Sequence, residues 1–270
     1  MPYLCTAKTN NLIDMALRFD TIRTVGTLLT IAILFTINTK NIEAQEYKYQ
    51  HGSLRLPYTE AAYHQDKPGQ SMLVLYLHPR QARGHNNDTQ QTVKAYRQLA
   101  HYLDSAGVKA VLVAPQCEES RHWNEYSAPL GKYMSDVVKD FLDDYITNHT
   151  DIDPSRIFAL GESFGASGVW RLVTDYPNYF VAAMPAVCSP KLDNLKRFVN
   201  IKKAAKTPLC LVAGENDEVY GPTVMAPYVA ELQQRHCDLN YVILQGHKHY
   251  QACNAPFPTP ALDWLFSHHR

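Results

Sequence analysis

Short apolar runs alternate with amphipathic helical stretches along most of this chain. Runs with the length and character of buried strands cover residues 72–77, 110–114, 156–160, 182–187, 208–213 and 241–244. Helical spacing falls between or after them, over residues 90–103, 132–146, 164–174, 223–234 and 260–266. Residues 47–56 read as an edge strand or hairpin. This alternation predicts an α/β fold, a mostly parallel sheet with helices on both faces.

Length and charge narrow the function classes. The chain has 270 residues, and no repeat or linker divides it, so we expect one folded domain over residues 45–270. Lysine plus arginine equals aspartate plus glutamate, 26 each, so the formal net charge is zero. A nucleic-acid-binding domain normally shows a basic face, so we expect no nucleic-acid partner.

The N-terminal stretch has the pattern of a secretory signal peptide over residues 1–44. Residues 25–37 are apolar except for interrupting threonines and a glycine. Arg18 and Arg23 precede them, and the small residue Ala44 follows. The run is shorter than the roughly 20 apolar residues of a membrane span. We therefore expect a secreted or periplasmic protein with no stable membrane partner, the alternative being an uncleaved N-terminal anchor. Met15 is an alternative start, because the residues before it are polar.

The cysteines do not predict a disulfide framework. Once Cys5 leaves with the leader, five cysteines remain, and an odd number excludes complete internal pairing. One disulfide is compatible with export, but the sequence does not name the pair. The cysteine spacing matches no zinc pattern, so we expect no metal and no cofactor.

The sequence Gly161-Glu162-Ser163-Phe164-Gly165 carries the clearest chemical signal. It directly follows the strand-like RIFAL and directly precedes the helical FGASGVWRLV. A G-x-S-x-G turn in that setting is sharp, and it projects the serine hydroxyl beside a helix N-terminus. Glycine and serine also occur in ordinary capped turns. The strand before and the helix after favour Ser163 as a nucleophile.

A serine nucleophile needs a base and an acid, which in such folds follow in the order serine, acid, histidine. The strand at residues 208–213 is followed by Gly-Glu-Asn-Asp, and we favour Asp217 over Glu215 as the acid. After the last strand, two histidines compete for the role of base, His247 and His249.

Two further segments stand at strand ends. An oxyanion needs two N–H donors; Phe164 would supply one, and the loop after residues 72–77 the other. Pro79 in that loop has no N–H, so Arg80 is the candidate. Trp123 follows another strand end, where it would form either a flat wall for substrate or a cover for the core.

Together these residues resemble the α/β-hydrolase superfamily, and more narrowly secreted bacterial esterases of the phospholipase/carboxylesterase and feruloyl-esterase-like type, related to polyhydroxybutyrate depolymerases. LYLHPRQARG is similar to the family's LHG-x-GERG loop, and VAPQCEESRHWNEY to its APQCP…W segment. RIFALGESFGASGVW is similar to the nucleophile block, and CLVAGENDEVY to the acid loop. The likeness runs from about Tyr47 to the C-terminus.

The resemblance implies an α/β-hydrolase fold with Ser163 as nucleophile, Asp217 as acid and His249 as base. The family histidine stands three residues after a glycine, and Gly246 to His249 keeps that interval. Two positions depart from the family: Pro79 and Ala166 replace glycines.

The expected activity is that of a serine esterase that works through an acyl-enzyme. The gap between residues 187 and 208 has room for about one helix, where this fold commonly houses a lid. An open site without a large lid domain suits short acyl, acetyl or feruloyl esters, small or polysaccharide-linked. A serine peptidase and a lipase are the alternatives on the same fold, and a binding module is a third. The sequence leaves the oligomeric state open.

Overall fold

The computed structural model describes residues 43–48, 55–128, 131–190 and 199–270. One compact unit extends over Ile42–Arg270. The predicted signal peptide, residues 1–44, lies outside the described residues except for Glu43 and Ala44, the first two residues of strand β1. Within the described ranges, no helix is long and apolar enough to span a bilayer.

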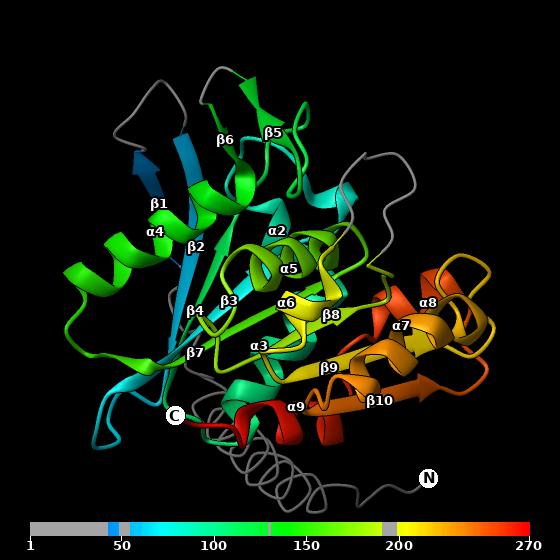
Figure 1. Ribbon diagram of the computed structural model, residues 1–270. Coiled ribbons are helices and arrows are strands. Elements are labelled where there is room, and N and C mark those ends of the chain that lie inside the picture. Colours follow the sequence, from blue (N-terminus) through cyan, green and yellow to red (C-terminus); the bar gives the residue numbers. More distant parts are fainter. Residues whose placement is uncertain (1–42, 49–54, 129–130, 191–198) are drawn as a thin grey trace, which may run out of the picture. The chain divides into compact units, whose positions relative to one another are not determined.

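The described strands of the main sheet follow the order β1-β2-β4-β3-β7-β8-β9-β10 (Figure 1). Their bounds are β1 (Glu43–Lys48), β2 (Arg55–Tyr63), β3 (Ser71–Leu77), β4 (Ala110–Pro115), β7 (Ile152–Glu162), β8 (Ala182–Ala186), β9 (Leu209–Gly214) and β10 (Leu239–Leu244). The six strands from β4 to β10 in this order are parallel, whereas β1 and β2 pair antiparallel at one edge. The predicted α/β class with a mostly parallel sheet is confirmed. A small hairpin, β5 (Tyr126–Ser127) with β6 (Lys132–Tyr133), stands apart from this sheet.

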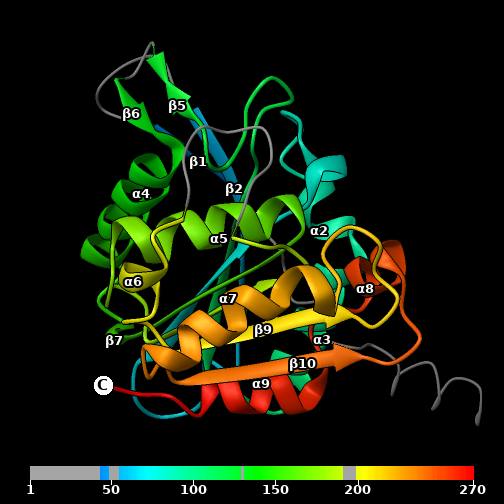
Figure 2. The same ribbon diagram turned by 45° about the vertical axis from the view of Figure 1, so that its right-hand side comes forward.

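Helices cover both faces of the sheet, as expected (Figure 2). One apolar cluster takes side chains from α4 (Met134–Asn148), α5 (Phe164–Asp175), α6 (Ile201–Ala204) and α7 (Pro222–Gln234). The other takes them from α3 (Lys94–Ser105), α8 (His249–Asn254) and α9 (Thr259–Phe266). Between β8 and β9, α6 is the one helix among the described residues, and no large lid is evident.

The central position of strand β3 in the sheet explains why its sequence is continuously apolar. Leu73, Leu75 and Leu77 belong to the cluster under α4 and α5. Met72, Val74 and Tyr76 alternate with them and belong to the opposite cluster. A central strand that is buried on both faces has no solvent side, so neither set is polar.

Strand β3 also marks where the chain changes direction across the sheet. β4 pairs with one side of β3, and β7 pairs with the other. In open α/β sheets such a point leaves a crevice beyond the carboxyl ends of the strands, where ligands bind. The loop after β3 and the turn after β7 therefore meet at one edge.

The helices differ from the expected ones at two points. The helix expected over 90–103 is split into α2 (Thr89–Thr92) and α3, because Val93 is extended, with φ −70° and ψ 149°. The helix α8 was not expected, because six residues are too few to show a helical period.

Candidate active site

Ser163 occupies a strained turn between β7 and α5. Its φ is 51° and its ψ is −115°, a conformation that costs a non-glycine residue of the order of 1–3 kcal/mol. The backbone around it is tied down: Ser163 N–H donates to Ala186 O at 3.0 Å, and Ser167 N–H donates to Ser163 O at 3.2 Å. The side chain of Ser163 is partly exposed at the start of a helix, as the sequence predicts.

The glycines on either side allow this turn to sit close to β3. A Cβ on Gly165 would lie 1.9 Å from the carbonyl oxygen of Leu77, and one on Gly161 would lie 2.8 Å from the same oxygen. This oxygen belongs to the backbone of a central strand of the sheet and has little room to move. Side chains at these two positions would push the turn away from the strand that it packs against.

Asp217 and His249 are hydrogen-bonded to each other. His249 Nδ1 lies 2.9 Å from Asp217 Oδ2, and the aspartate side chain is fully buried. The N–H groups of Val219 and Tyr220 donate to the other carboxylate oxygen, both at 2.8 Å. Every oxygen of this buried carboxylate therefore has a donor, and the imidazole is oriented by it.

These contacts displace the pKa values of both groups. Burial acts to raise the pKa of Asp217, but hydrogen bonds from His249, Tyr220 and Val219 outweigh it, so the pKa lies below its ordinary value. The hydrogen bonds of His249 with Asp217 and Cys253 raise the pKa of His249 above its ordinary value, against the effect of burial. The pair therefore favours an ionised acid beside an imidazole that readily holds a proton.

The two alternative residues have other partners. Glu215 accepts from the backbone N–H of Gly246 at 2.7 Å, and His247 Nδ1 lies 2.8 Å from the carbonyl oxygen of Gln245. These contacts fasten the turn after β10. The structure thus brings Asp217 together with His249, and it gives Glu215 and His247 local roles in that turn.

His249 and Ser163 stand on different strand ends of the same sheet edge. Ser163 follows β7, Asp217 follows β9, and β8 lies between these strands. Among the described residues, no hydrogen bond joins Ser163 to His249. The other ring nitrogen, His249 Nε2, lies instead 3.7 Å from Cys253 Sγ.

The loop after β3 is held by a buried histidine that the sequence analysis did not single out. His78 Nε2 accepts from Cys117 N–H at 2.9 Å, and Nδ1 donates to Pro79 O at 2.8 Å. Burial lowers the pKa of His78 to about 4, so the ring is neutral at pH 7. A histidine directly after a buried strand was the available signal.

Further bonds join this loop to the segment after β4. Gly84 N–H donates to Cys117 O at 2.9 Å, and Gln116 Nε2 donates to Ala82 O at 3.1 Å. Arg80 begins the short 3-10 helix Arg80–Ala82, and its side chain is exposed. Among the described residues, the Arg80 N–H has no acceptor. Phe164 is the first residue of α5, a position whose N–H has no acceptor within the helix.

Trp123 is buried, with 1% of its surface exposed. Its indole N–H donates to His78 O at 3.1 Å, and its ring centroid lies 5.1 Å from that of His78. The side chain therefore leaves almost no surface for a substrate. This placement favours the second alternative of the sequence analysis, a tryptophan that covers the core.

Two other expectations concern metals and disulfides. Within the described ranges, no group of histidine, cysteine and acidic side chains could hold a metal ion. The five described cysteines, Cys117, Cys188, Cys210, Cys237 and Cys253, are free thiols.

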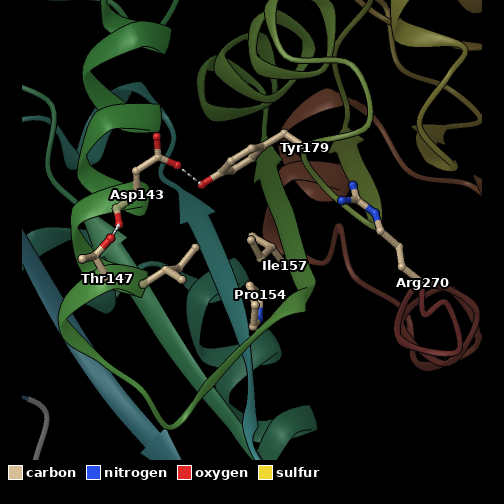
Figure 3. A pocket seen from close by; sticks show the side chains of 7 residues that line it. Asp143, Thr147, Pro154, Ile157, Tyr179 and Arg270 are labelled. Atoms are coloured by element: carbon tan, nitrogen blue, oxygen red, sulfur yellow. Dashed lines mark hydrogen bonds between the residues drawn. The ribbon is translucent and has the colours of Figure 1, made fainter.

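A separate pocket lies at the other end of β7. Figure 3 shows it between α4 and the start of that strand, with Tyr179 donating to Asp143 at 2.8 Å across it. Ile157 lines it and stands six positions before Ser163, which corresponds to roughly 20 Å along a strand. This pocket is not part of the serine site.

Comparison with solved structures identifies the fold. A thermostable esterase superposes with a TM-score of 0.69 at 19% identity, over 85% of this chain and 63% of that one. S-formylglutathione hydrolase (FrmB) from Staphylococcus aureus gives 0.65 at 13% identity, over 85% and 100%. A ferulic acid esterase gives 0.65 at 12% identity, over 84% and 98%. No family model and no curated protein sequence matches the chain. The chain is similar to these enzymes in fold, and that fold is the α/β-hydrolase fold.

Proposed function

We propose that the protein is a serine esterase that hydrolyses carboxylic esters through an acyl-enzyme. The observation that carries the proposal is the buried Asp217–His249 hydrogen bond at the same sheet edge as the strained Ser163. Serine, acid and histidine follow in the chain order of α/β-hydrolases. Several proteins of similar fold are esterases or hydrolases by name, which supports the reaction class.

In the proposed reaction, His249 Nε2 takes the proton of the Ser163 hydroxyl as its oxygen attacks the ester carbonyl. The tetrahedral intermediate collapses, and His249 gives the proton to the leaving alcohol. Water then attacks the acyl-enzyme with the same base, which releases the acid and restores Ser163. Asp217 holds the imidazole at Nδ1, which leaves Nε2 as the nitrogen that takes the proton, and it stabilises the charged form.

The N–H groups of Phe164 and Arg80 are the proposed oxyanion donors. The N–H of Phe164 lies at the positive end of α5, and a helix N-terminus favours negative charge there. His78 and Trp123 would serve as positioning residues, because their hydrogen bonds hold the loop that carries Arg80. A donor that is fixed before the reaction needs no reorganisation when the oxyanion forms.

The proposed substrates are short acyl, acetyl or feruloyl esters, either small molecules or groups linked to a polysaccharide. The absence of a large lid among the described residues supports small or exposed esters over lipid droplets. Export by the leader at residues 1–44 belongs to the same proposal. The chemistry proposed uses no metal or cofactor.

A panel of acetyl, butyryl, feruloyl and long-chain esters, with a peptide substrate beside them, tests the proposal. We expect turnover of the short or feruloyl esters and a loss of several orders of magnitude in kcat for Ser163→Ala, with KM little changed. A preference for long acyl chains would favour a lipase, and cleavage of peptide alone a peptidase. Wild-type activity in Ser163→Ala would overturn the assignment of the nucleophile.

A further inference from the structure

The second ring nitrogen of His249 has a partner that the proposed reaction does not use. His249 Nε2 lies 3.7 Å from Cys253 Sγ, within hydrogen-bond distance for sulfur. Cys253 stands four residues after His249 on α8, and side chains at that spacing meet on one face of a helix. The imidazole is therefore held at both nitrogens, by Asp217 at Nδ1 and by Cys253 at Nε2.

The packing of α8 against the sheet fixes the position of the Cys253 thiol. Ala252, the residue before Cys253, is fully buried and belongs to the apolar cluster on that face of the sheet. A Cβ on Gly214 at the end of β9 would lie 3.2 Å from Ala252 Cβ, so α8 lies tight against that strand. Cys253 itself is partly buried against the same cluster. The sulfur of Cys253 is thus held beside the imidazole by the packing of α8.

Other titratable groups also lie near this pair. The ring of Tyr220 lies 5.6 Å from the His249 ring, edge to face. Cys188, after β8, and Tyr76, on β3, interact electrostatically with Cys253, but burial raises the pKa of both well above its ordinary value. Asp217 is ionised throughout the neutral range. The thiol of Cys253 is therefore the neighbour whose removal changes the surroundings of Nε2 most.

We propose that Cys253 is a positioning residue for His249: its thiol holds Nε2 in the resting enzyme and yields that nitrogen to Ser163 for each acyl transfer. The proposal rests on the proposed function, because it assigns His249 as the base. It makes Cys253 a brake on that base. Cys253 Sγ accepts from the Nε2–H of the imidazolium, and a hydrogen bond that stabilises the imidazolium opposes the neutral form that accepts a proton.

Removing the thiol has a predicted direction. In Cys253→Ala, the imidazolium loses a partner, so we expect the acid limb of kcat/KM to move to lower pH by about one unit. At pH values below the wild-type acid limb, kcat/KM of the variant should then exceed that of the wild type by up to about tenfold, because each pH unit is a tenfold change in the fraction of neutral imidazole. The rise should appear in kcat with KM unchanged, since Cys253 is not proposed to contact substrate.

The experiment compares pH profiles of kcat/KM for the wild type, Cys253→Ala and Cys253→Ser. Serine keeps a polar partner at this position and should restore part of the wild-type limb. Cys237→Ala is the matched control: this thiol lies 3.5 Å from Thr207 O, in the turn between α7 and β10, and its loss should leave the profile unchanged. Should the alanine variant not fold, the serine variant carries the comparison.

An NMR titration of the His249 imidazole, made in Ser163→Ala with and without Cys253→Ala, gives a readout that needs no turnover. A lower pKa without the thiol supports the proposal. Identical titrations and identical acid limbs would overturn it, even if Ser163→Ala is inactive and the esterase assignment stands. If Ser163→Ala keeps full activity, the proposed function fails, and the titration alone still decides whether Cys253 holds His249.

Discussion

Two neighbouring residues at the end of β7, Glu162 and Ser163, are each held in a state that is unfavourable by itself. Ser163 has a positive φ. Val187, which directly follows the neighbouring strand β8, also has a positive φ, of 56°. A β-branched residue in that region is a clear outlier. The bond from Ser163 N–H to Ala186 O and that from Val187 N–H to Val212 O, at 2.7 Å, hold these conformations in place. Strained backbone of this kind is concentrated at functional sites.

Glu162 adds a second cost. It is 1% exposed, Tyr76 donates to Oε1 at 3.0 Å, and Oε2 has no partner among the described residues. Burial raises the pKa of Glu162 well above its ordinary value, so the carboxyl is neutral when the chain is folded. A charged form there would be both desolvated and short of donors.

The buried carboxyl makes stability depend on pH. Below the unfolded pKa, Glu162 is protonated in both states, so its ionisation does not affect stability there. As the pH rises above about 4.5, the unfolded chain ionises there and the folded chain does not, so the free energy of unfolding falls. We expect Glu162→Gln to remove this fall. At pH 8 it should be measurably more stable than the wild type, with near equality at pH 4.5.

Urea denaturation at the two pH values measures this difference. Glu119→Gln is the control, because Glu119 is exposed and should change stability little at either pH. A glutamine variant that is less stable than the wild type at pH 8 would show that the carboxyl of Glu162 contributes to the fold in its charged form.

At the scale of elements, the approach of α5 to β3 sets the position of Ser163. Gly165 meets the backbone of Leu77, whereas Gly168, one turn later, meets the Leu77 side chain and Trp123 Cβ, both at 2.7 Å. The contact at Gly165, 1.9 Å from a backbone oxygen of a central strand, is closer than either contact at Gly168, one of which a change of the Leu77 rotamer can relieve. The two glycines should therefore differ in their tolerance of a methyl group.

We expect Gly165→Ala to reduce the free energy of unfolding by about 3 kcal/mol or more, beyond the usual cost of overpacking. Gly168→Ala should cost less, about 1–3 kcal/mol, offset in part by the better helix propensity of alanine. Denaturant midpoints of the two variants give the comparison. Equal midpoints would mean that α5 does not lie as close to Leu77 O as the structure has it.

The elements that sequence predicts well are those with a period. The strands buried on both faces and the long helix α4 are found within a few residues of their expected bounds. The break at Val93 and the helix α8 are not, because a single extended residue and one and a half turns leave no periodic signal. Cys253 was read only as one of five remaining cysteines for this reason: without α8, nothing places it beside His249.

At the scale of the molecule, the parallel sheet explains why residues far apart in sequence meet. Strand order puts β3, β7, β8 and β9 side by side, so their carboxyl ends gather Arg80, Ser163 and Asp217 at one edge. The chain order of strands and motifs predicts this gathering. The pairing of Asp217 with His249, rather than of Glu215 with His247, depends on turn geometry, which the residues alone left open.

The buried network behind the loop after β3 also lies beyond sequence reasoning. His78, Cys117 and Trp123 come from two loops and meet only because β3 and β4 are neighbours. Their hydrogen bonds use backbone groups, which leave no mark in residue type. Fold class and candidate nucleophile follow from pattern, whereas the second layer of contacts follows from packing.

Fluorophosphonate labelling followed by peptide mass spectrometry tests the nucleophile most directly. We expect one adduct per chain, on the Ser163 hydroxyl. It should be absent in Ser163→Ala and form far more slowly in His249→Ala. An adduct on another residue would show that Ser163 is not the nucleophile. So would a Ser163→Ala variant that still reacts with the probe and still hydrolyses esters.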